Sequence, residues 1–460
     1  MIDNHLLALS PLDGRYAIRM KKLRHFFSEY GYISYRIKVE VFWFIQISEI
    51  GLREFQPISS GAKKELISWI ENICDKDIAE IKKIESKINH DVKSVEYFLK
   101  NKAKKSNFNE IAGNFEFFHF CCTSEDINNI SHSMMMLDAK EQILLPTIEK
   151  ILKKLSQIIE ETGEDAMLSK THGQAASPTT MGKEIANFRA RLRRTRNRLK
   201  KIEIYAKFNG AVGNLNAHKI SSPDIDWLEV SDLFIKKLGF ENNNMTTQIE
   251  PHDWIAEYCD AVFAINVIFI DMSRDLWGYI SAGYFTQNIN DSEVGSSTMP
   301  HKVNPIDFEN AEGNLGIANS LLKHFSEKLP VSRFQRDLTD STVIRNLGVA
   351  IGHSYLAYLS LIKGLNKISI NRAKLVKDLE ESWEIVAEPI QTYLRSRGIS
   401  EPYERLKELT RGNQVSRETF VKFIMELDIS NDDKDHLLKI TPSNYVGYAP
   451  LLAKKELEND

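Results

Sequence analysis

A short polar loop holds the residues of this chain that are best suited to chemistry. It contains a glycine, three consecutive hydroxyl residues, a lysine and an asparagine, in the order Gly295-Ser296-Ser297-Thr298-Met299-Pro300-His301-Lys302-Val303-Asn304-Pro305. The glycine leaves Ser296 clear of its backbone, while Lys302 and Asn304 supply a cation and an amide on alternate residues. Such a set can hold a carboxylate beside a serine. A flexible solvated connector is the alternative interpretation, and the chemistry alone leaves both open.

Helical segments must position this loop. Apolar residues recur at three- and four-residue spacing along most of the chain, which favours helices over strands. Helical stretches are expected from Met20 to about Ile88, Val92 to Lys105, about Asn128 to Thr162, Pro178 to about Tyr205, Asp253 to about Phe285, Pro305 to Lys328, and on to about Leu365. No convincing β-ladder or internal repeat is visible in the sequence, so the predicted fold class is all-α.

The stretch after Pro251 predicts an unusually apolar helix, roughly 50 Å long at about 1.5 Å per residue. Its centre is apolar almost all round, with Val262, Phe263, Ile265, Val267, Ile268, Phe269 and Ile270. A helix of this kind must be covered on several faces. We therefore expect a helix bundle that is shared between subunits.

Bulk properties argue against several classes of protein. Lysine plus arginine number 60 and aspartate plus glutamate 63, so the net charge of −3 argues against a dedicated nucleic-acid or membrane-surface protein. The four cysteines show no metal-site spacing, which favours a reduced, cytoplasmic compartment. Neither a secretory signal nor a membrane-spanning run is visible. The glycines at 182 and 210–213 lack the context of a phosphate loop or a dinucleotide fingerprint, so no nucleotide cofactor is expected.

Several polar breaks have both a structural and a functional interpretation. The segment Ser10 to Tyr16 is either an arm pinned to the surface or an arm that lays Arg15 and Tyr16 over an anionic site. His90 with Asp91 is either a helix cap or a histidine placed for proton or phosphate chemistry. The basic segment 189–201 favours a solvated face near a helix C-terminus over a nucleic-acid surface.

Five separated motifs give the chain a family resemblance. They are Ser10-Pro11-Leu12-Asp13-Gly14-Arg15-Tyr16, Thr123-Ser124-Glu125-Asp126, Thr171-His172-Gly173-Gln174, Thr247-Gln248-Ile249-Glu250-Pro251-His252-Asp253 and the loop 295–305. The loop resembles the signature loop of the fumarase/aspartase superfamily. The full set, with Arg336 and Arg345 bracketing Asp340-Ser341-Thr342, resembles the adenylosuccinate lyase family in its longer bacterial form. Argininosuccinate lyase and a non-catalytic helical scaffold are the alternatives, and intact Ser296, His172 and Lys302 speak against the scaffold.

The resemblance implies a fold and an activity. The expected subunit has three helical domains (1–112, 113–364 and 365–460), and its central long-helix bundle forms a homotetramer with active sites shared between subunits. The implied reaction is carbon–nitrogen β-elimination of fumarate from adenylosuccinate, giving AMP, and from the succinyl-carboxamide imidazole ribotide, giving AICAR. The resemblance implies a small-molecule substrate, with no cofactor, metal, nucleic acid or membrane partner.

The resemblance also implies residue roles. Ser296 matches the general base, which must be ionised by nearby N–H groups and Lys302 when the loop closes. His172 matches the general acid that protonates the departing purine nitrogen. The implied substrate-binding residues are Arg15, Tyr16, Asn89, His90, Asp91, Thr123, Ser124, Gln248, Ser297, Lys302, Val303, Asn304, Asn310, Arg336, Ser341, Thr342 and Arg345. Ala175 replaces the family's proline after His-Gly-Gln, which affects the expected stiffness of that loop. His252 and His301 are expected to be structural.

Overall fold

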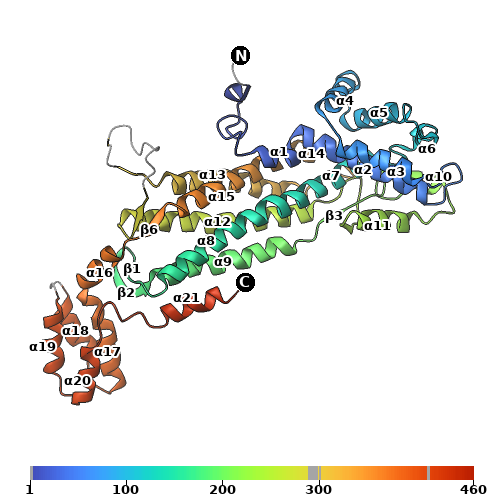
Figure 1. Ribbon diagram of the computed structural model, residues 1–460. Coiled ribbons are helices and arrows are strands. Elements are labelled where there is room, and N and C mark those ends of the chain that lie inside the picture. The colour runs from blue at the N-terminus through green and yellow to red at the C-terminus, as the bar shows by residue number, and fades with distance from the viewer. Residues whose placement is uncertain (1–3, 289–298, 300–301, 412–414, 460) are drawn as a thin grey trace. The chain divides into compact units, whose positions relative to one another are not determined.

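The computed structural model describes residues 4–288, 299, 302–411 and 415–459, and most of them are helical (Figure 1). The predicted dominance of helix is therefore confirmed. The chain separates into two compact units, each built from three segments. Unit 1 comprises Met1–Thr147, Arg196–Asn266 and Asn314–Leu356, and unit 2 comprises Ile148–Thr195, Val267–Gly313 and Ala357–Asp460. The division into three domains stays a prediction.

Unit 1 consists mainly of helices that pack around α2. Its elements are η1 (Asn4–Leu7), α1 (Lys21–Phe27), α2 (Glu29–Glu49), α3 (Ser60–Glu71), α4 (Asp75–Ile88), α5 (Asp91–Ala103), α6 (Asn109–Ala112), η2 (Phe115–Phe117), α7 (Ser124–Ala139), η3 (Lys140–Leu144), β3 (Tyr205–Ala206), α10 (Asn216–Ser221), α11 (Trp227–Lys237), β4 (Glu241–Asn242) and α14 (Thr339–Ile344). The Ser28 hydroxyl caps α2 by accepting from the Gly31 N–H. Trp43 of α2 is fully buried, with its ring centroid 4.0 Å from that of Phe208. Helix α2 therefore holds the centre of unit 1.

Unit 2 ends in a cluster of short helices. Its elements are β1 (Ala166–Thr171), β2 (Gln174–Thr180), β5 (Phe285–Gln287), β6 (Ile368–Ile370), α16 (Arg372–Glu380), η4 (Trp383–Val386), α17 (Ala387–Ser396), α18 (Pro402–Thr410), α19 (Arg417–Met425), α20 (Asn431–Leu438) and α21 (Ala449–Leu457). Helices α17 to α20 gather around a shared apolar core that includes Ile390, Leu394 and Phe420 (Figure 1).

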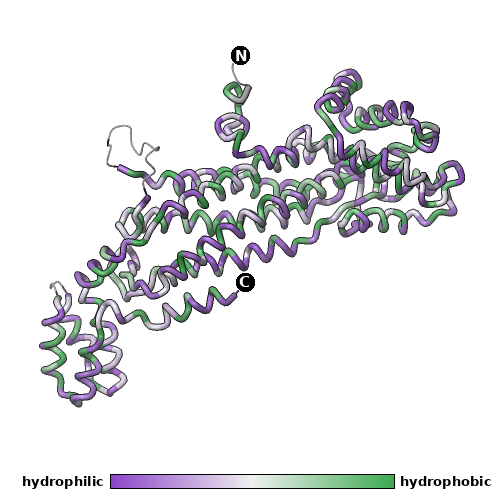
Figure 2. Tube along the Cα trace, in the orientation of Figure 1, coloured by the Kyte–Doolittle hydropathy of each residue, from purple (hydrophilic) through white to green (hydrophobic). Residues whose placement is uncertain are grey.

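The long helices were predicted closely. They are α8 (Leu145–Thr162), α9 (Met181–Lys201), α12 (Asp253–Ser281), α13 (Ile306–Lys328) and α15 (Leu347–Leu365), and each has residues in both units. Hydrophobic and hydrophilic positions are interspersed along α8 and α9, as expected for helices that bury one side, whereas no residue of α15 is exposed (Figure 2). No helix among the described residues combines the length and apolar character needed to cross a membrane.

Three short two-stranded sheets correct the expectation that β-ladders are absent. The clearest is a hairpin in which Thr171 of β1 pairs with Gln174 of β2, which leaves His172 and Gly173 as a two-residue loop. Both loop residues have positive φ, 53° and 76°, as the tightest hairpin turns require. Pro178 lies in β2, so α9 begins later than predicted, at Met181. The polar composition of this exposed segment suggested a loop, but the residues on either side of the turn pair as strands.

The prediction that the basic segment 189–201 forms a solvated face was wrong in part. Arg189 is buried, and its Nη1 donates to Glu456 Oε1 at 2.8 Å and to the Glu456 carbonyl at 2.6 Å. Arg193 Nη2 lies 3.2 Å from Glu456 Oε2. These two arginines therefore fasten the C-terminal helix α21 within unit 2, rather than simply facing solvent.

Candidate active site

A cavity of about 800 Å³ lies in unit 1, where the ends of several helices meet. It gathers ten of the residues that the family resemblance implied. These are Asn89, His90, Asp91, Thr123, Ser124, Gln248, Arg336, Ser341, Thr342 and Arg345. They come from four separate stretches of sequence (89–91, 123–124, 248 and 336–345), so the fold brings together motifs that the chain keeps far apart.

The N-terminus of α7 forms one wall of the cavity. Thr123 is its N-cap, and Asp126 completes a capping box by accepting from the Thr123 N–H at 2.8 Å. Asp126 is fully buried and pairs with the equally buried Lys207 at 2.9 Å. This pair fixes the first turn, where Thr123 and Ser124 line the cavity. A helix N-terminus favours anions because its free N–H groups and its dipole both point outward.

The break between α4 and α5 forms a second wall. Asn89 ends α4 in the left-handed region, with φ 52°. His90 then caps α5, since its Nδ1 accepts from the Lys93 N–H at 3.1 Å. The cap interpretation of His90 is therefore confirmed. The same residue lines the cavity, so capping and a binding role are compatible.

Asp91 links two arginines. It lies 2.7 Å from Arg36, which is 1% exposed, and 2.8 Å from Arg345, which is 45% exposed. Burial alone would raise the pKa of Asp91, but the two guanidinium groups lower it to about 2. Arg36 is held in turn by Asn128 at 2.9 Å and by the Tyr32 ring beneath it at 3.8 Å. Asp91 thus orients Arg345 at the mouth of the cavity.

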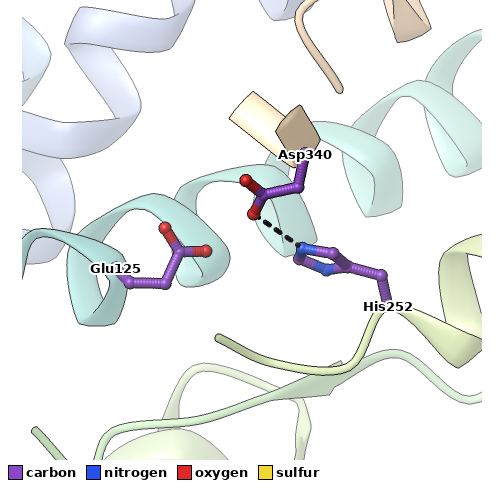
Figure 3. Close-up of side chains that lie close together, drawn as sticks. All are labelled: Glu125, His252 and Asp340. Carbon is purple, nitrogen blue, oxygen red and sulfur yellow. Dashed lines mark ion pairs between the residues drawn. The ribbon is translucent and has the colours of Figure 1, made fainter. Parts of the chain in front are cut away.

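Arg336 also lines the cavity. Its Nη1 donates to Glu125 Oε2 at 2.9 Å, and its Nη2 donates to Ser341 Oγ at 3.2 Å. Behind it lie Glu125, His252 and Asp340, which come from three different elements and face one another (Figure 3). All three are buried.

The donor atoms of Glu125, His252 and Asp340 lie within 4.8 Å of one another, which is close enough to raise the question of a metal ion. Two observations argue against a metal ion at this position. Glu125 already pairs with the guanidinium of Arg336. Burial alone would lower the pKa of His252, yet the carboxylates of Asp340 and Glu250 raise it to about 9. Arg336 thus pairs with one of the carboxylates and a protonated ring faces the others, and this arrangement favours an ion-pair network over a metal centre.

The remaining implied residues lie outside the lining of this cavity. Arg15 and Tyr16 precede α1, with the Arg15 guanidinium 5.9 Å from the Tyr16 ring centroid. His172 is exposed at the tip of the β1–β2 hairpin. Lys302, Val303, Asn304 and Asn310 belong with His172 to unit 2. Ser296, Ser297 and His301 lie outside the described residues.

Sequence reasoning missed several residues of the cavity wall. They are Tyr32, Glu85, Glu125, Asn128, His132, His252, Leu338, Asp340, Ile344 and Asn346. One signal was available, because Ser124, Asn128 and His132 recur every four residues and so share one face of α7. Burial and the nearby Arg36 lower the pKa of His132 to about 3, so its ring is neutral near pH 7. His252, expected to be structural, lines the cavity.

The fold is shared with solved structures of low sequence identity. A fumarate lyase from Mesorhizobium sp. BNC1 superposes with a TM-score of 0.76 at 15% identity, covering 96% of this chain and 98% of that one. A 3-carboxy-cis,cis-muconate lactonizing enzyme from Pseudomonas putida gives a TM-score of 0.75 at 18% identity, covering 95% and 96%. Proteins named for different reactions thus share this architecture, so the fold alone leaves the reaction open.

Sequence comparison is more specific. Residues 14–318 match a family described as lyase, and residues 332–446 match the adenylosuccinate lyase C-terminal family. The adenylosuccinate lyase of Haemophilus influenzae is 50% identical over 451 residues, which is 98% of each chain. That of Escherichia coli K12 is 48% identical over 445 residues, or 96% of this chain and 97% of its own. Near-full-length identity at this level shows that the chain belongs to the adenylosuccinate lyase family.

Proposed function

We propose that this protein catalyses the elimination of fumarate from adenylosuccinate, giving AMP, and from the succinyl-carboxamide imidazole ribotide, giving AICAR. One observation carries the proposal beyond family membership. The cavity of unit 1 combines two arginines, a helix N-terminus and several hydroxyl and amide groups, which suits a polyanionic nucleotide. These reactions belong to purine nucleotide synthesis and need no cofactor.

The proposal assigns the nucleotide end to the arginines. Arg336 and Arg345 present forked donors that match phosphate oxygens, and Ser341 and Thr342 add hydroxyl groups beside them. Arg345 is about half exposed and is oriented by Asp91, so it can meet a phosphate entering from solvent. Arg15 and Tyr16 complete this end. Asn89, His90 and Asp91 bind or position the same part of the substrate.

The proposed chemistry begins at a very weak carbon acid. The Ser296 alkoxide removes the proton from the carbon beside a succinyl carboxylate, which leaves extra charge on an already anionic group. Lys302, Asn304, Thr123, Ser124 and Gln248 are assigned as the preorganised donors that stabilise this charge. The electron pair then forms the double bond of fumarate as the carbon–nitrogen bond breaks.

The His172 imidazolium gives a proton to the departing purine nitrogen, which leaves as a neutral N–H group while His172 becomes neutral imidazole. Imidazole suits this task near pH 7. Ser297, Val303 and Asn310 are proposed as further substrate contacts. The side chain of Ala175 does not supply the stiffness of a proline, so the hairpin turn at His172 and Gly173 must hold the general acid in place.

The assembly we propose is a homotetramer whose active sites draw residues from several subunits. Apolar side chains on the long helices support this, because Val267, Trp277, Ile306 and Ile317 are 42%, 46%, 53% and 51% exposed in the single chain. Burying them against another copy would give α12 the cover that its sequence demands. The four cysteines are all free thiols, which supports a cytoplasmic location.

Fumarate release from adenylosuccinate by the purified protein tests the proposal directly. The assay is run with and without EDTA and contains no added nucleotide cofactor, and argininosuccinate is tried in parallel. We expect release from adenylosuccinate alone, at an unchanged rate with and without EDTA. Release from argininosuccinate instead, or from neither compound, would refute the assignment of the substrate.

A further inference from the structure

The motif residue His252 takes part in more contacts than a buried histidine needs for packing. It is 2% exposed, and its backbone lies in the left-handed region at φ 66°. Its carbonyl accepts from the Ile255 and Ala256 N–H groups, which begins α12, and its N–H donates to Glu250 Oε2 at 2.7 Å. These contacts at the N-terminal end of α12 therefore fix the position of the His252 ring.

The ring sits among carboxylates from different elements. Its Nδ1 lies 3.7 Å from Glu250 Oε2 and its Nε2 lies 3.6 Å from Asp340 Oδ2. Glu125 of α7 closes the group (Figure 3). These distances suit ion pairs better than ideal hydrogen bonds. The imidazole thus faces Glu250 on the approach to α12 and Asp340 in the first turn of α14, with Glu125 at the start of α7 within 4.8 Å.

Those carboxylates also hold the residues that face the cavity. Glu125 accepts from Arg336, and Asp340 Oδ1 accepts from the Ser341 N–H at 2.7 Å. A further bond joins the same two stretches, since the Gln248 N–H donates to the Gln335 carbonyl at 3.2 Å. The positions of Arg336 and Ser341 therefore depend on carboxylates that would repel one another without a cation between them.

We propose that His252 is a positioning residue that ties Asp340, Glu250 and Glu125 together and thereby sets Arg336 and Ser341 against the anionic end of the substrate. The inference rests on the proposed function, because it assigns the nucleotide end to this wall. His252 itself touches the carboxylates and acts on the substrate through them.

The charge state of the ring makes the inference sensitive to pH. The anionic groups facing His252 are Glu250, Asp340 and Glu125; Arg336 is a nearby cation, and the neighbouring His132 is neutral near pH 7. Burial opposes protonation, but the carboxylates raise the pKa of His252 to about 9. Its raised pKa means that the tie is intact below about 6.5, its unfolded value, and is lost as the pH rises through about 9.

Two substitutions distinguish the effect of the positive charge of His252 from the effect of its shape. His252→Asn removes the cation with a residue that tolerates positive φ, and His252→Lys keeps a cation. His353→Asn is the matched control, because His353 is buried in unit 1 and its Nδ1 contacts the Asn314 amide oxygen rather than carboxylates. Steady-state kinetics with adenylosuccinate are measured for each variant from about pH 7 to pH 10.

We expect His252→Asn to raise KM roughly tenfold with a smaller change in kcat, since displacing a binding group by 1 Å can cost up to about 100-fold. In the wild type, KM should rise as the pH passes about 9. That rise should be absent in His252→Asn and shifted upward in His252→Lys, and His353→Asn should behave as the wild type. A wild-type KM and pH profile in His252→Asn would overturn the inference.

A second measurement uses only the wild type, so it tests the inference even when His252→Asn fails to fold. Calorimetry of AMP binding to the wild type should show affinity falling between about pH 8 and pH 10, a range in which AMP itself does not titrate. Constant affinity would overturn the inference while fumarate release still supported the function. Loss of activity in EDTA and its recovery with Mn²⁺ would also overturn it, because Glu125, His252 and Asp340 would then be metal ligands.

Discussion

Replacing Asp91 by Asn should remove a measurable part of the stability of the protein. Asp91 pairs with Arg36 at 2.7 Å and with Arg345 at 2.8 Å, and its side chain is 27% exposed. The two guanidinium groups overcome the effect of burial and lower its pKa from 3.8 to about 2. At about 1.36 kcal/mol for each pH unit, this difference corresponds to about 2 kcal/mol.

The sign follows from the direction of the change. A folded-state pKa below the unfolded value means that the stabilisation is present above about pH 4 and is lost as the pH falls through about 2. Near neutral pH the full stabilisation of about 2 kcal/mol is therefore present. Urea denaturation followed by circular dichroism, at matched protein concentration, should show Asp91→Asn with about 2 kcal/mol less free energy of unfolding than the wild type.

Asp271→Asn is the matched control. Asp271 also pairs with an arginine, Arg191, at 2.6 Å, but the two side chains are 49% and 31% exposed. Water screens such a pair, so we expect a loss below about 1 kcal/mol. Equal losses in the two variants would refute the reasoning, as would a difference between wild type and Asp91→Asn that varies between about pH 6 and pH 8.

Two further predictions concern the catalytic pair and the buried pair under α7. Ser296→Ala and His172→Ala should each lose most turnover while still binding adenylosuccinate, and mixing the two should restore part of the activity through hybrid tetramers; no recovery after verified subunit exchange would contradict the shared site. Asp126→Asn leaves the fully buried Lys207 without its counter-ion, so the free energy of unfolding, again from urea denaturation, should fall by about 3–5 kcal/mol, and a loss as small as that of Asp271→Asn would contradict it.

The helices were predictable because their apolar spacing is itself the cause of the packing. The ends of α8 at Thr162, α13 at Lys328 and α15 at Leu365 fall where the sequence predicted. The β1–β2 hairpin was not predicted, because its polar tip lacks apolar alternation. The available signal was the dipeptide His172-Gly173, two residues that both tolerate the positive φ of a tight hairpin turn.

The residues of the candidate site were predictable only through the sequence motifs. The ion pairs that hold those residues in place were not predictable. Arg345 and Asp91 could be named separately from sequence, but their ion pair spans residues 254 positions apart. Likewise, Arg36 lies in the middle of an apolar helix, and nothing local shows that its guanidinium reaches Asp91. Burial and long-range pairing decide such contacts, and neither is encoded in a short stretch of chain.

The alternation of the two units along the sequence has a consequence for synthesis. Unit 1 receives its last segment only when residue 356 has been made, and unit 2 needs residues from its final segment, which begins at 357. At about 5–20 residues per second, the ribosome needs roughly 18–71 s to reach that point. Until then the contacts of the last segment of unit 1 cannot form, among them the hydrogen bond from Asn266 of α12 to Ser354. A nascent chain of this topology therefore completes its first compact unit later than a chain whose compact units are contiguous.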